Sequence, residues 1–352
     1  MGQFGYVVSP HTTDDIVRRY AALRFLPAPL IERAAAHARP VPIGQVEVHI
    51  FPSRQLPASV DLAGDVVALP FTKTLVERLP PPVVIGRVKK AVAMLGTKDI
   101  RAIGLLGGIA ANGVWTVLAR QLSVPVTSGD AGRLWALLQA VEKFLAAQGK
   151  PLCQSTVAIL GADRPVGRVA ALILAPNVES MWLVGTAPFT IQRLAAEIMR
   201  HSGLSPWSAH DLVKARPPPQ VVFITAPSDW QQIVQAALGP GTVFCELVRV
   251  TAPPPLAELS GDPVVIRGGL VTVPGSVHLP PAFRLPGGTV TGAMAEVILR
   301  ALGPGGRWGH GGLPANLPAV MQVASLARRY DFHVTAVSGI TRGGRVCLPV
   351  AT

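Results

Sequence analysis

The sequence is poor in cysteine: it has three such residues among 352, and Cys153, Cys245 and Cys347 lie far apart. No two of them have CxxC spacing, which argues against a disulfide framework and against a structural zinc or other metal site. Sparse thiols of odd number suit a reducing compartment, so we expect a cytoplasmic protein. Cys153 and Cys245 lie in or beside strand-like runs, where buried and unreactive thiols are expected.

Long hydrophobic runs are also missing. A membrane-spanning helix needs about 20 consecutive apolar residues, whereas the best runs here, 169–174 and 221–226, are short and flanked by Pro, Arg or Asp. Residues 1–9 show no basic region followed by an apolar segment, so we expect no signal peptide. The sequence predicts no transmembrane span.

Charged residues make up only 15% of the chain and aromatic residues 5%, while apolar residues reach 49%. This composition is not typical of a disordered chain. Because the apolar residues are mostly Ala, Val and Leu, they suit helices packed on a parallel sheet. A chain of 352 residues is longer than one hydrophobic core usually supports, so we expect two domains.

Acidic residues are outnumbered, and the formal net charge is +12. One interpretation is an acidic partner, such as an anionic membrane face or an acidic carrier protein. The other is a coding bias toward Arg, Ala, Gly and Pro. The basic residues are scattered, with no cluster denser than 87–90, and aromatic residues do not interleave with them. We therefore expect no nucleic-acid binding.

Strand-like and helix-like segments alternate from residue 150 onward. Strands are expected at 156–160, 181–184, 220–225 and 243–248, with helices at 166–174, 190–199 and 230–238 between them. Such alternation indicates βαβ units and a parallel sheet. The fold class predicted is α/β, with a Rossmann-type doubly wound parallel sheet plus an N-terminal α/β substrate domain.

The flanking segments are less regular. Before residue 150 we expect strands at 46–51, 66–69 and 103–106, and helices at 83–95, 113–122 and 131–148, with Pro80, Pro81 and Pro82 stopping what precedes them. After the parallel sheet we expect strands at 264–267 and 270–273 and helices at 292–302 and 319–330. This predicts an N-terminal domain over 1–150, a Rossmann-type domain over 151–285 and a C-terminal helical segment over 286–352.

A glycine-containing turn follows the first strand of the central domain. Gly161 and Gly167 fit the outer positions of a GxxGxxG dinucleotide fingerprint, which lets backbone and a helix N-terminus approach a pyrophosphate. The middle position holds Arg164, whose side chain either crowds the phosphates or neutralises one of them. Both interpretations stay open.

The ends of the next strands complete the candidate cofactor site. Thr186 follows the second strand, and no charged residue appears until Arg193, so the choice between NAD and NADP is not readable. Thr225 and Ala226 follow the third strand, where the nicotinamide half would lie. Both residues are candidate cofactor contacts.

The chain resembles the long-chain acyl-[acyl-carrier-protein] reductases, which form fatty aldehydes. The resembling runs, in order, are Gly5–Ser9, Gly104–Gly108, Thr127–Asp130, Thr156–Gly167, Gly268–Val271, Ala295–Leu299 and Trp308–Gly309. The resemblance implies an N-terminal domain that holds the acyl chain, a central domain that binds NADPH, and a C-terminal stretch that completes the site. It also implies acyl carrier protein or an acyl-CoA thioester as the partner.

The family uses a cysteine thiolate that takes the acyl group as a thioester. The matching position in this chain is Ala293, which cannot be acylated. Two hypotheses follow. One is an NAD(P)H-dependent reductase of acyl thioesters that works by direct hydride transfer or a displaced nucleophile. The other is a non-catalytic protein that binds an acyl group or an acyl carrier.

Four polar residues lie nearest the segments that the resemblance assigns to the active site: Ser128, Asp130, His278 and Glu296. Each also has a structural interpretation. Ser128 and Asp130 are helix-capping residue types, Glu296 is explained as a surface residue of a helix, and His278 as a loop residue.

Overall fold

The structure is a computed structural model. It describes residues 2–52, 56, 58–96, 99–111, 114–122, 124–213, 215–226, 228–236, 238–247, 256–303 and 316–350. The Trp308–Gly309 run and the end of the expected strand 243–248 lie outside these residues.

The chain divides into two compact units, each assembled from separate stretches. Unit 1 comprises Met1–Gly132, Thr272–Leu313 and Gln322–His333, and unit 2 comprises Arg133–Val271, Pro314–Met321 and Val334–Thr352. The expected third segment, 286–352, therefore contributes to both units. Its described part contains strands as well as helices.

Unit 1 begins with a strand and a series of short helices. Its N-terminal elements are β1 (Gly2–Ser9), α1 (Thr13–Arg19), the 3₁₀ helix η1 (Ala21–Phe25), α2 (Ala28–His37), β2 (Val41–Ile50), β3 (Val60–Ala68), α3 (Lys73–Arg78), α4 (Pro81–Ala93), β4 (Ile100–Gly107), η2 (Gly108–Ala111), α5 (Val114–Gln121) and β5 (Val126–Thr127). From the later stretch come β12 (Gly275–His278), η5 (Pro281–Phe283), β13 (Thr289–Thr291) and α10 (Gly292–Leu302).

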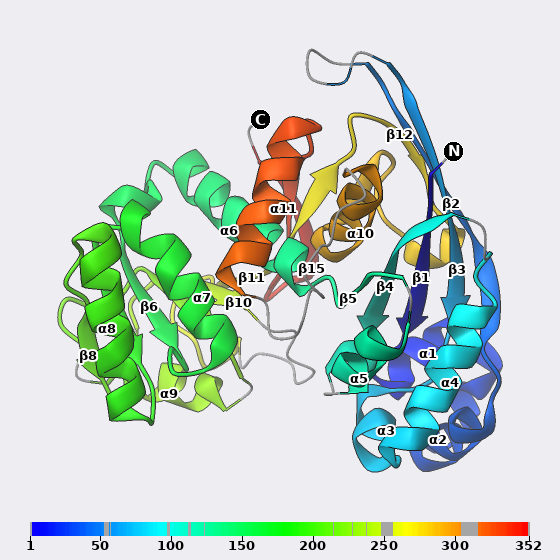
Figure 1. Ribbon diagram of the computed structural model, residues 1–352. Helices are drawn as coiled ribbons and strands as arrows, with labels where there is room; N and C mark the ends of the chain where they lie inside the picture. The colour runs from blue at the N-terminus through cyan, green and yellow to red at the C-terminus, as the bar shows by residue number, and fades with distance from the viewer. Residues whose placement is uncertain are drawn as a thin grey trace. The chain divides into compact units, whose positions relative to one another are not determined.

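The sheet of unit 1 has the order β12-β2-β3-β1-β4-β5. β1 lies between β3 and β4 and is parallel to both, while β2 runs antiparallel to β3 and β12 antiparallel to β2. One face of this sheet is covered by α1 to α5, which share a core cluster with Val7, Ile103 and Leu105 of the strands. Figure 1 shows α1, α2, α3 and α4 grouped together in blue and cyan.

The other face of that sheet packs against α10. Side chains alternate along a strand, so Tyr6 points away from Val7, and its hydroxyl donates to the Met294 carbonyl over 2.9 Å. Gly104 lies beside Tyr6, and a Cβ there would come within 2.6 Å of Val297. The absence of a side chain at Gly104 is therefore what allows α10 to lie so close to β4.

Unit 2 contains the alternating segments that the sequence predicted. Its elements are η3 (Leu152–Gln154), β6 (Thr156–Leu160), α7 (Pro165–Leu174), η4 (Ala175–Asn177), β7 (Ser180–Val184), α8 (Pro188–Ser202), β8 (Trp207–Ala209), β9 (Val221–Ile224), α9 (Asp229–Ala236), β10 (Val243–Glu246), β11 (Val264–Thr272), β14 (His333–Thr341) and β15 (Gly344–Pro349). α6 (Asp130–Ala147) and α11 (Leu317–Arg329) each cross a boundary between the units.

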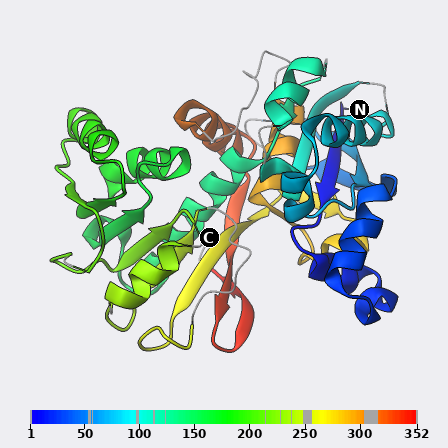
Figure 2. The same ribbon diagram turned by 90° about the horizontal axis from the view of Figure 1, so that it is seen from below.

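The order of strands in this second sheet is β15-β14-β11-β10-β9-β6-β7-β8. From β8 to β11 all adjacent strands are parallel. Numbered by their sequence within the sheet, the six strands β6 to β11 have the order 3-2-1-4-5-6, which is that of the Rossmann fold. The α/β class with a doubly wound parallel sheet is thus confirmed. β14 and β15 form an antiparallel hairpin, drawn in red in Figure 2.

The central strands of this sheet are buried on both faces, as expected for a parallel sheet covered by helices. Every residue of β6, β9 and β10 is buried. These strands are apolar in the sequence except for Thr156 in β6 and Glu246 in β10. β6 and α10 begin and end where the sequence predicted. The expected strands 264–267 and 270–273 are one strand, β11, because Gly268 and Gly269 continue the extended backbone.

The largest departure from the predictions lies at the N-terminus and at the C-terminus. α1 and α2 were not expected, although Asp15 caps the start of α1 by accepting from Thr12 N over 3.2 Å. The three prolines 80–82 do more than end a segment, because Pro81 and Pro82 form the first turn of α4. The β14–β15 hairpin was also not expected.

Candidate functional site

The candidate cofactor site lies at the carboxyl edge of the unit 2 sheet. β6 has β7 on one side and β9 on the other, so the order of strands reverses beside β6. Ligands of open α/β sheets bind at such a point, outside the carboxyl ends of the strands. The predicted residues Gly161, Arg164, Gly167, Thr186, Thr225 and Ala226 all lie in the turns that leave β6, β7 and β9 or in the first helical turn after them.

The turn between β6 and α7 requires glycine at both predicted positions. Gly161 has φ +67°, and a Cβ there would lie 2.1 Å from the Thr225 hydroxyl oxygen. A Cβ at Gly167 would lie 2.3 Å from the Gly161 carbonyl oxygen, so the first turn of α7 packs directly on this loop. Neither position of the turn therefore has room for a side chain.

Arg164 is the residue before α7 and its guanidinium turns toward the end of β9. Its Nη1 donates to the Thr225 hydroxyl over 2.7 Å and lies 3.2 and 3.3 Å from the two carboxylate oxygens of Asp229. The Arg164 side chain is 41% exposed, whereas that of Asp229 is 3% exposed. Arg164 therefore lies over the turn, held by groups of the protein itself.

Asp229, which sequence reasoning missed, organises the loop after β9. Its Oδ2 accepts from the backbone N–H groups of Thr225 and Ala226, each over 2.8 Å. The Thr225 hydroxyl is 2.8 Å from the Leu160 carbonyl oxygen, which links the ends of β6 and β9. The local signal was an acidic residue in the first turn of a helix, a position that favours carboxylates.

Asp163 is a second acidic residue that sequence reasoning missed. Its Oδ2 accepts from the N–H groups of Thr186 and Ala187, both over 3.0 Å, and lies 3.3 Å from the Thr186 hydroxyl. A Cβ at Gly185 would come within 2.7 Å of the Asp163 carboxylate, so the loop after β7 closes tightly on it. The carboxyl end of β7 has no charged residue of its own. The Asp163 carboxylate, from the turn between β6 and α7, supplies a negative charge there.

The predicted residues thus form two groups. Gly161, Arg164 and Thr225 contact one another, whereas Thr186 contacts Asp163. The turns together carry one guanidinium and two carboxylates, a formal charge of −1. Binding of a phosphate is therefore favoured only if the Arg164 guanidinium leaves the Asp229 carboxylate and binds the phosphate instead.

Unit 1 brings together two of the segments on which the family resemblance rests. Ala293 is the second residue of α10, and a Cβ at Gly129 would lie 2.6 Å from the Ala293 Cβ. The Ser128 hydroxyl accepts from the backbone N–H of Asp130 over 3.4 Å at the start of α6, which agrees with a capping role. All three cysteines belong to unit 2, so unit 1 has no thiol.

Glu296 is not a surface residue of its helix. It is 1% exposed, and its Oε1 accepts from the Thr127 hydroxyl over 2.5 Å and from Arg300 Nε over 2.9 Å. Its Oε2 accepts from Gly132 N over 2.8 Å. Because the first turns of α6 and α10 lie in contact, the carboxylate is enclosed between them and ties one to the other.

The remaining candidates are dispersed. His278 ends strand β12 rather than lying in a loop, and it is exposed. Cys245 is buried in β10, and burial raises the pKa of its thiol well above the ordinary value of 9.0. Cys153, expected to be buried, is exposed in η3, and Cys347 is exposed in β15. Among the described residues no group of three or more His, Cys, Asp and Glu side chains is arranged to hold a metal ion.

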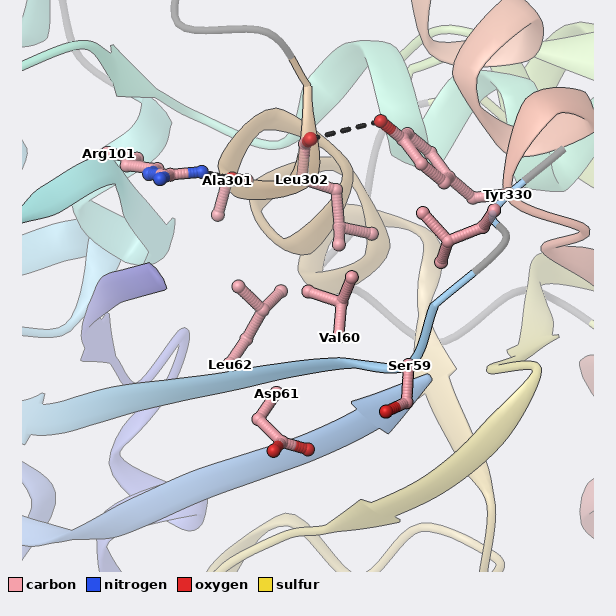
Figure 3. A pocket seen from close by; sticks show the side chains of 9 residues that line it. Ser59, Val60, Asp61, Leu62, Arg101, Ala301, Leu302 and Tyr330 are labelled. Atoms are coloured by element: carbon pink, nitrogen blue, oxygen red, sulfur yellow. Dashed lines mark hydrogen bonds between the residues drawn. The ribbon is translucent and has the colours of Figure 1, made fainter. Parts of the chain in front are cut away.

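A cavity of about 480 Å³ lies in unit 1, away from every predicted site residue. Figure 3 shows Val60 and Leu62 pointing toward Ala301 and Leu302 of α10, while Asp61 points to the other side of β3. The Tyr330 hydroxyl closes one side by donating to the Leu302 carbonyl over 3.0 Å. The lining also includes Ser59 and Arg101, so polar and apolar residues share it.

None of the helices in the described part of the chain is long and apolar enough to span a bilayer.

Comparisons with known proteins add little to this geometry. No protein-family model and no curated protein matches the chain, so the acyl-carrier-protein reductase family is not supported by them. Among solved structures, L-tryptophan dehydrogenase from Nostoc punctiforme is 12% identical, with a TM-score of 0.38 over 94% of this chain and 80% of that one. A superposition this loose does not bear on the activity of the present chain.

Proposed function

We propose that unit 2 binds a nicotinamide dinucleotide, NAD or NADP, and that the chain is an NAD(P)-dependent oxidoreductase. The observation that carries this proposal is the glycine turn at the strand-order reversal, where neither Gly161 nor Gly167 has room for a Cβ. A turn of this form brings backbone close to a pyrophosphate. The cofactor would supply or accept hydride.

Arg164 is the residue that we propose to hold a phosphate. Its side chain is 41% exposed and ends beside Thr225, so rotation of its outer bonds takes the guanidinium from Asp229 to an anion above the turn. Arginine binds phosphate through paired N–H donors, which makes it suited to this exchange. Asp229 keeps its two backbone donors when Arg164 leaves.

The finer assignment is the reduction of fatty acyl thioesters, on acyl carrier protein or coenzyme A, to aldehydes. Because Ala293 offers no nucleophile, the reaction would proceed by direct hydride transfer to the thioester carbonyl carbon. Hydride from the bound cofactor would form the new C–H bond, the C–S bond would break, and the leaving sulfur would take a proton from solvent to give a free thiol. This assignment rests on the sequence resemblance.

A second candidate is a non-catalytic protein that binds an acyl group or an acyl carrier. The observation that favours it is the pair of replacements: Arg164 sits in the phosphate turn, paired with Asp229, and Ala293 packs beside Gly129 in a unit without cysteine. Such a protein would keep the fold and bind no dinucleotide.

Calorimetric titration of the full chain with NADPH and with NADH separates the candidates. Saturable binding in the micromolar range supports the oxidoreductase, and its absence supports the second candidate. The structural control is Gly161→Ala, which abolishes binding because its Cβ meets Thr225, compared with Gly239→Ala, where a Cβ meets nothing within 4 Å. If a dinucleotide binds, an aldehyde assay with acyl-carrier and acyl-CoA substrates tests the finer assignment.

A further inference from the structure

A continuous apolar segment of unit 1 lies on the surface of the protein. Residues 20–30 read Tyr-Ala-Ala-Leu-Arg-Phe-Leu-Pro-Ala-Pro-Leu, and within this stretch Leu23 alone is not exposed. η1 contributes no buried residue at all. The exposed fraction is 76% for Phe25, 51% for Leu30 and 45% for Leu26. Exposed apolar patches of this kind mark surfaces that contact another phase or partner.

The helix that follows continues the surface on one side only. Ile31 and Ala35 of α2 are buried in the core of unit 1. Residues 30, 33, 34 and 37 lie on the opposite face at helical spacing and are all exposed. The outer face thus begins with the Leu30 side chain and continues with the Arg33 guanidinium.

Positive charge flanks the apolar segment and enters it. Residues 18–39 contain five arginines and one acidic residue, Glu32. The Glu32 side chain is only 18% exposed and accepts from Arg78 Nη1 over 3.2 Å. The Arg24 guanidinium lies 4.6 Å from the centroid of the Phe25 ring, which places a cation on the most exposed aromatic side chain of the segment.

Several backbone positions of the segment expose no unbonded N–H group. Four of its N–H groups bond within the segment or to α1: Tyr20 N to Ile16 O, Leu23 N to Tyr20 O, Leu26 N to Leu23 O and Leu30 N to Pro27 O, at 2.9–3.0 Å. Pro27 and Pro29 have no N–H to satisfy. In an apolar phase each unbonded backbone donor would oppose insertion, and these six residues add no such donor.

From these observations we infer that residues 18–33 form a docking surface for an anionic lipid bilayer. Phe25, Leu26 and Leu30 would enter the headgroup boundary, and Arg18, Arg24 and Arg33 would face lipid phosphates, as in interfacial amphipathic segments. Five arginines against one acidic residue in 18–39 match an anionic surface, and a protein partner is an outcome of the test below.

The test is co-sedimentation of the full chain with vesicles of phosphatidylcholine alone and of phosphatidylcholine mixed with phosphatidylglycerol. We expect binding that requires phosphatidylglycerol and weakens as salt rises. Phe25→Ser should reduce the partition coefficient about tenfold or more. The matched control is Phe189→Ser: Phe189 is 72% exposed in α8 of unit 2 and has Arg193 5.8 Å from its ring centroid.

Arg24→Gln should likewise weaken vesicle binding, whereas its counterpart Arg193→Gln in unit 2 should not. Thermal melting of each variant shows whether it is folded. Failure to bind either vesicle, equal binding to both, or equal binding by the Phe25→Ser and wild-type chains overturns the proposal. If Phe25→Ser instead dissociates an oligomer of the free protein, or abolishes binding to an acidic carrier protein in the absence of lipid, the surface belongs to a protein contact and the proposal is equally overturned.

Discussion

Arg164 and Asp229 form an ion pair across the carboxyl ends of β6 and β9, with Nη1 of the arginine 3.2 Å from the nearer carboxylate oxygen. The two residues are unequally placed, since the guanidinium is partly in water while the carboxylate is 3% exposed. Whatever happens to the arginine, the carboxylate keeps its bonds to the backbone of its own loop. The pair therefore has a fixed member and a mobile one, and variants of each should have different effects.

Replacement of the fixed member should lower stability. Asp229→Ala leaves the N–H groups of Thr225 and Ala226 without their acceptor, and we expect a loss of about 2–4 kcal/mol in the free energy of unfolding. Urea unfolding measures it. Asp262→Ala removes an exposed carboxylate from the same unit and should change stability little. Equal effects of the two substitutions would show that the Asp229 bonds contribute nothing.

Replacement of the mobile member should affect affinity more than stability. Arg164→Gln keeps polarity but removes the charge, and we expect the Kd for NADPH to rise about tenfold. The control is Arg168→Gln in the following helix α7, where the guanidinium pairs with Glu197. Tighter binding by Arg164→Gln would mean that the side chain obstructs the phosphate, contrary to the role proposed here.

The enclosed carboxylate of unit 1 makes a separate prediction. Glu296→Gln removes the carboxylate charge that pairs with the buried Arg300 guanidinium, and we expect a loss of about 3–5 kcal/mol in the free energy of unfolding. Glu47→Gln, an exposed residue of β2, is the comparison. Because the two variants remove the same charge from the same unit, a similar small effect of both in calorimetric melting would contradict a linking role for Glu296.

The thiols should differ in reactivity. Cys153 and Cys347 are exposed, while Cys245 is buried with a raised pKa. We expect a thiol reagent at neutral pH to modify the first two in the native protein and Cys245 only on unfolding. Mass spectrometry of the labelled chain identifies the sites. Rapid modification of Cys245 in the folded chain would show that β10 is accessible.

Burial of the same thiol should make stability fall in alkali. The folded state retains the Cys245 proton to a higher pH than the unfolded chain does, because burial raises the folded pKa above 9.0. As pH rises through the ordinary thiol pKa the unfolded state loses the proton first and is favoured. Urea unfolding at neutral and at alkaline pH should show the decrease, and Cys245→Ala should remove its thiol component. The Tyr6 hydroxyl, whose pKa burial also raises, contributes in the same direction at higher pH.

The sequence predicted elements whose residues are buried in a regular pattern. β6 is a continuous apolar run between Ser155 and Gly161, and α10 carries a helical period, so both were located correctly. η1 and the start of α2 were missed because their apolar residues face outward and Pro27 and Pro29 interrupt them. The β14–β15 hairpin carried a signal in the β-branched residues of 333–341 and the glycines at 343 and 344, which sequence reasoning did not use.

Of the candidate site residues, the two glycines are the ones whose place in a tight turn the sequence predicted, because local backbone geometry determines them. Gly161 and Gly167 are recognisable because a turn at that position admits no side chain. Asp163 was not predicted because it binds a loop that follows another strand. Asp229 had a local signal in the first turn of α9, but its ion pair with Arg164 joins residues far apart in the sequence. The burial of Glu296 depends on the approach of α6 to α10, which no local pattern encodes.

The assembly of unit 1 from both ends of the chain affects how it is made. Tyr6 and Gly104 emerge from the ribosome early, whereas α10, which covers them, follows only after β6 to β11 have been synthesised. A nascent chain must therefore hold one face of its first sheet uncovered through the translation of the whole Rossmann sheet. During that interval the uncovered face is open to chaperones, or to mispairing with other unfinished chains.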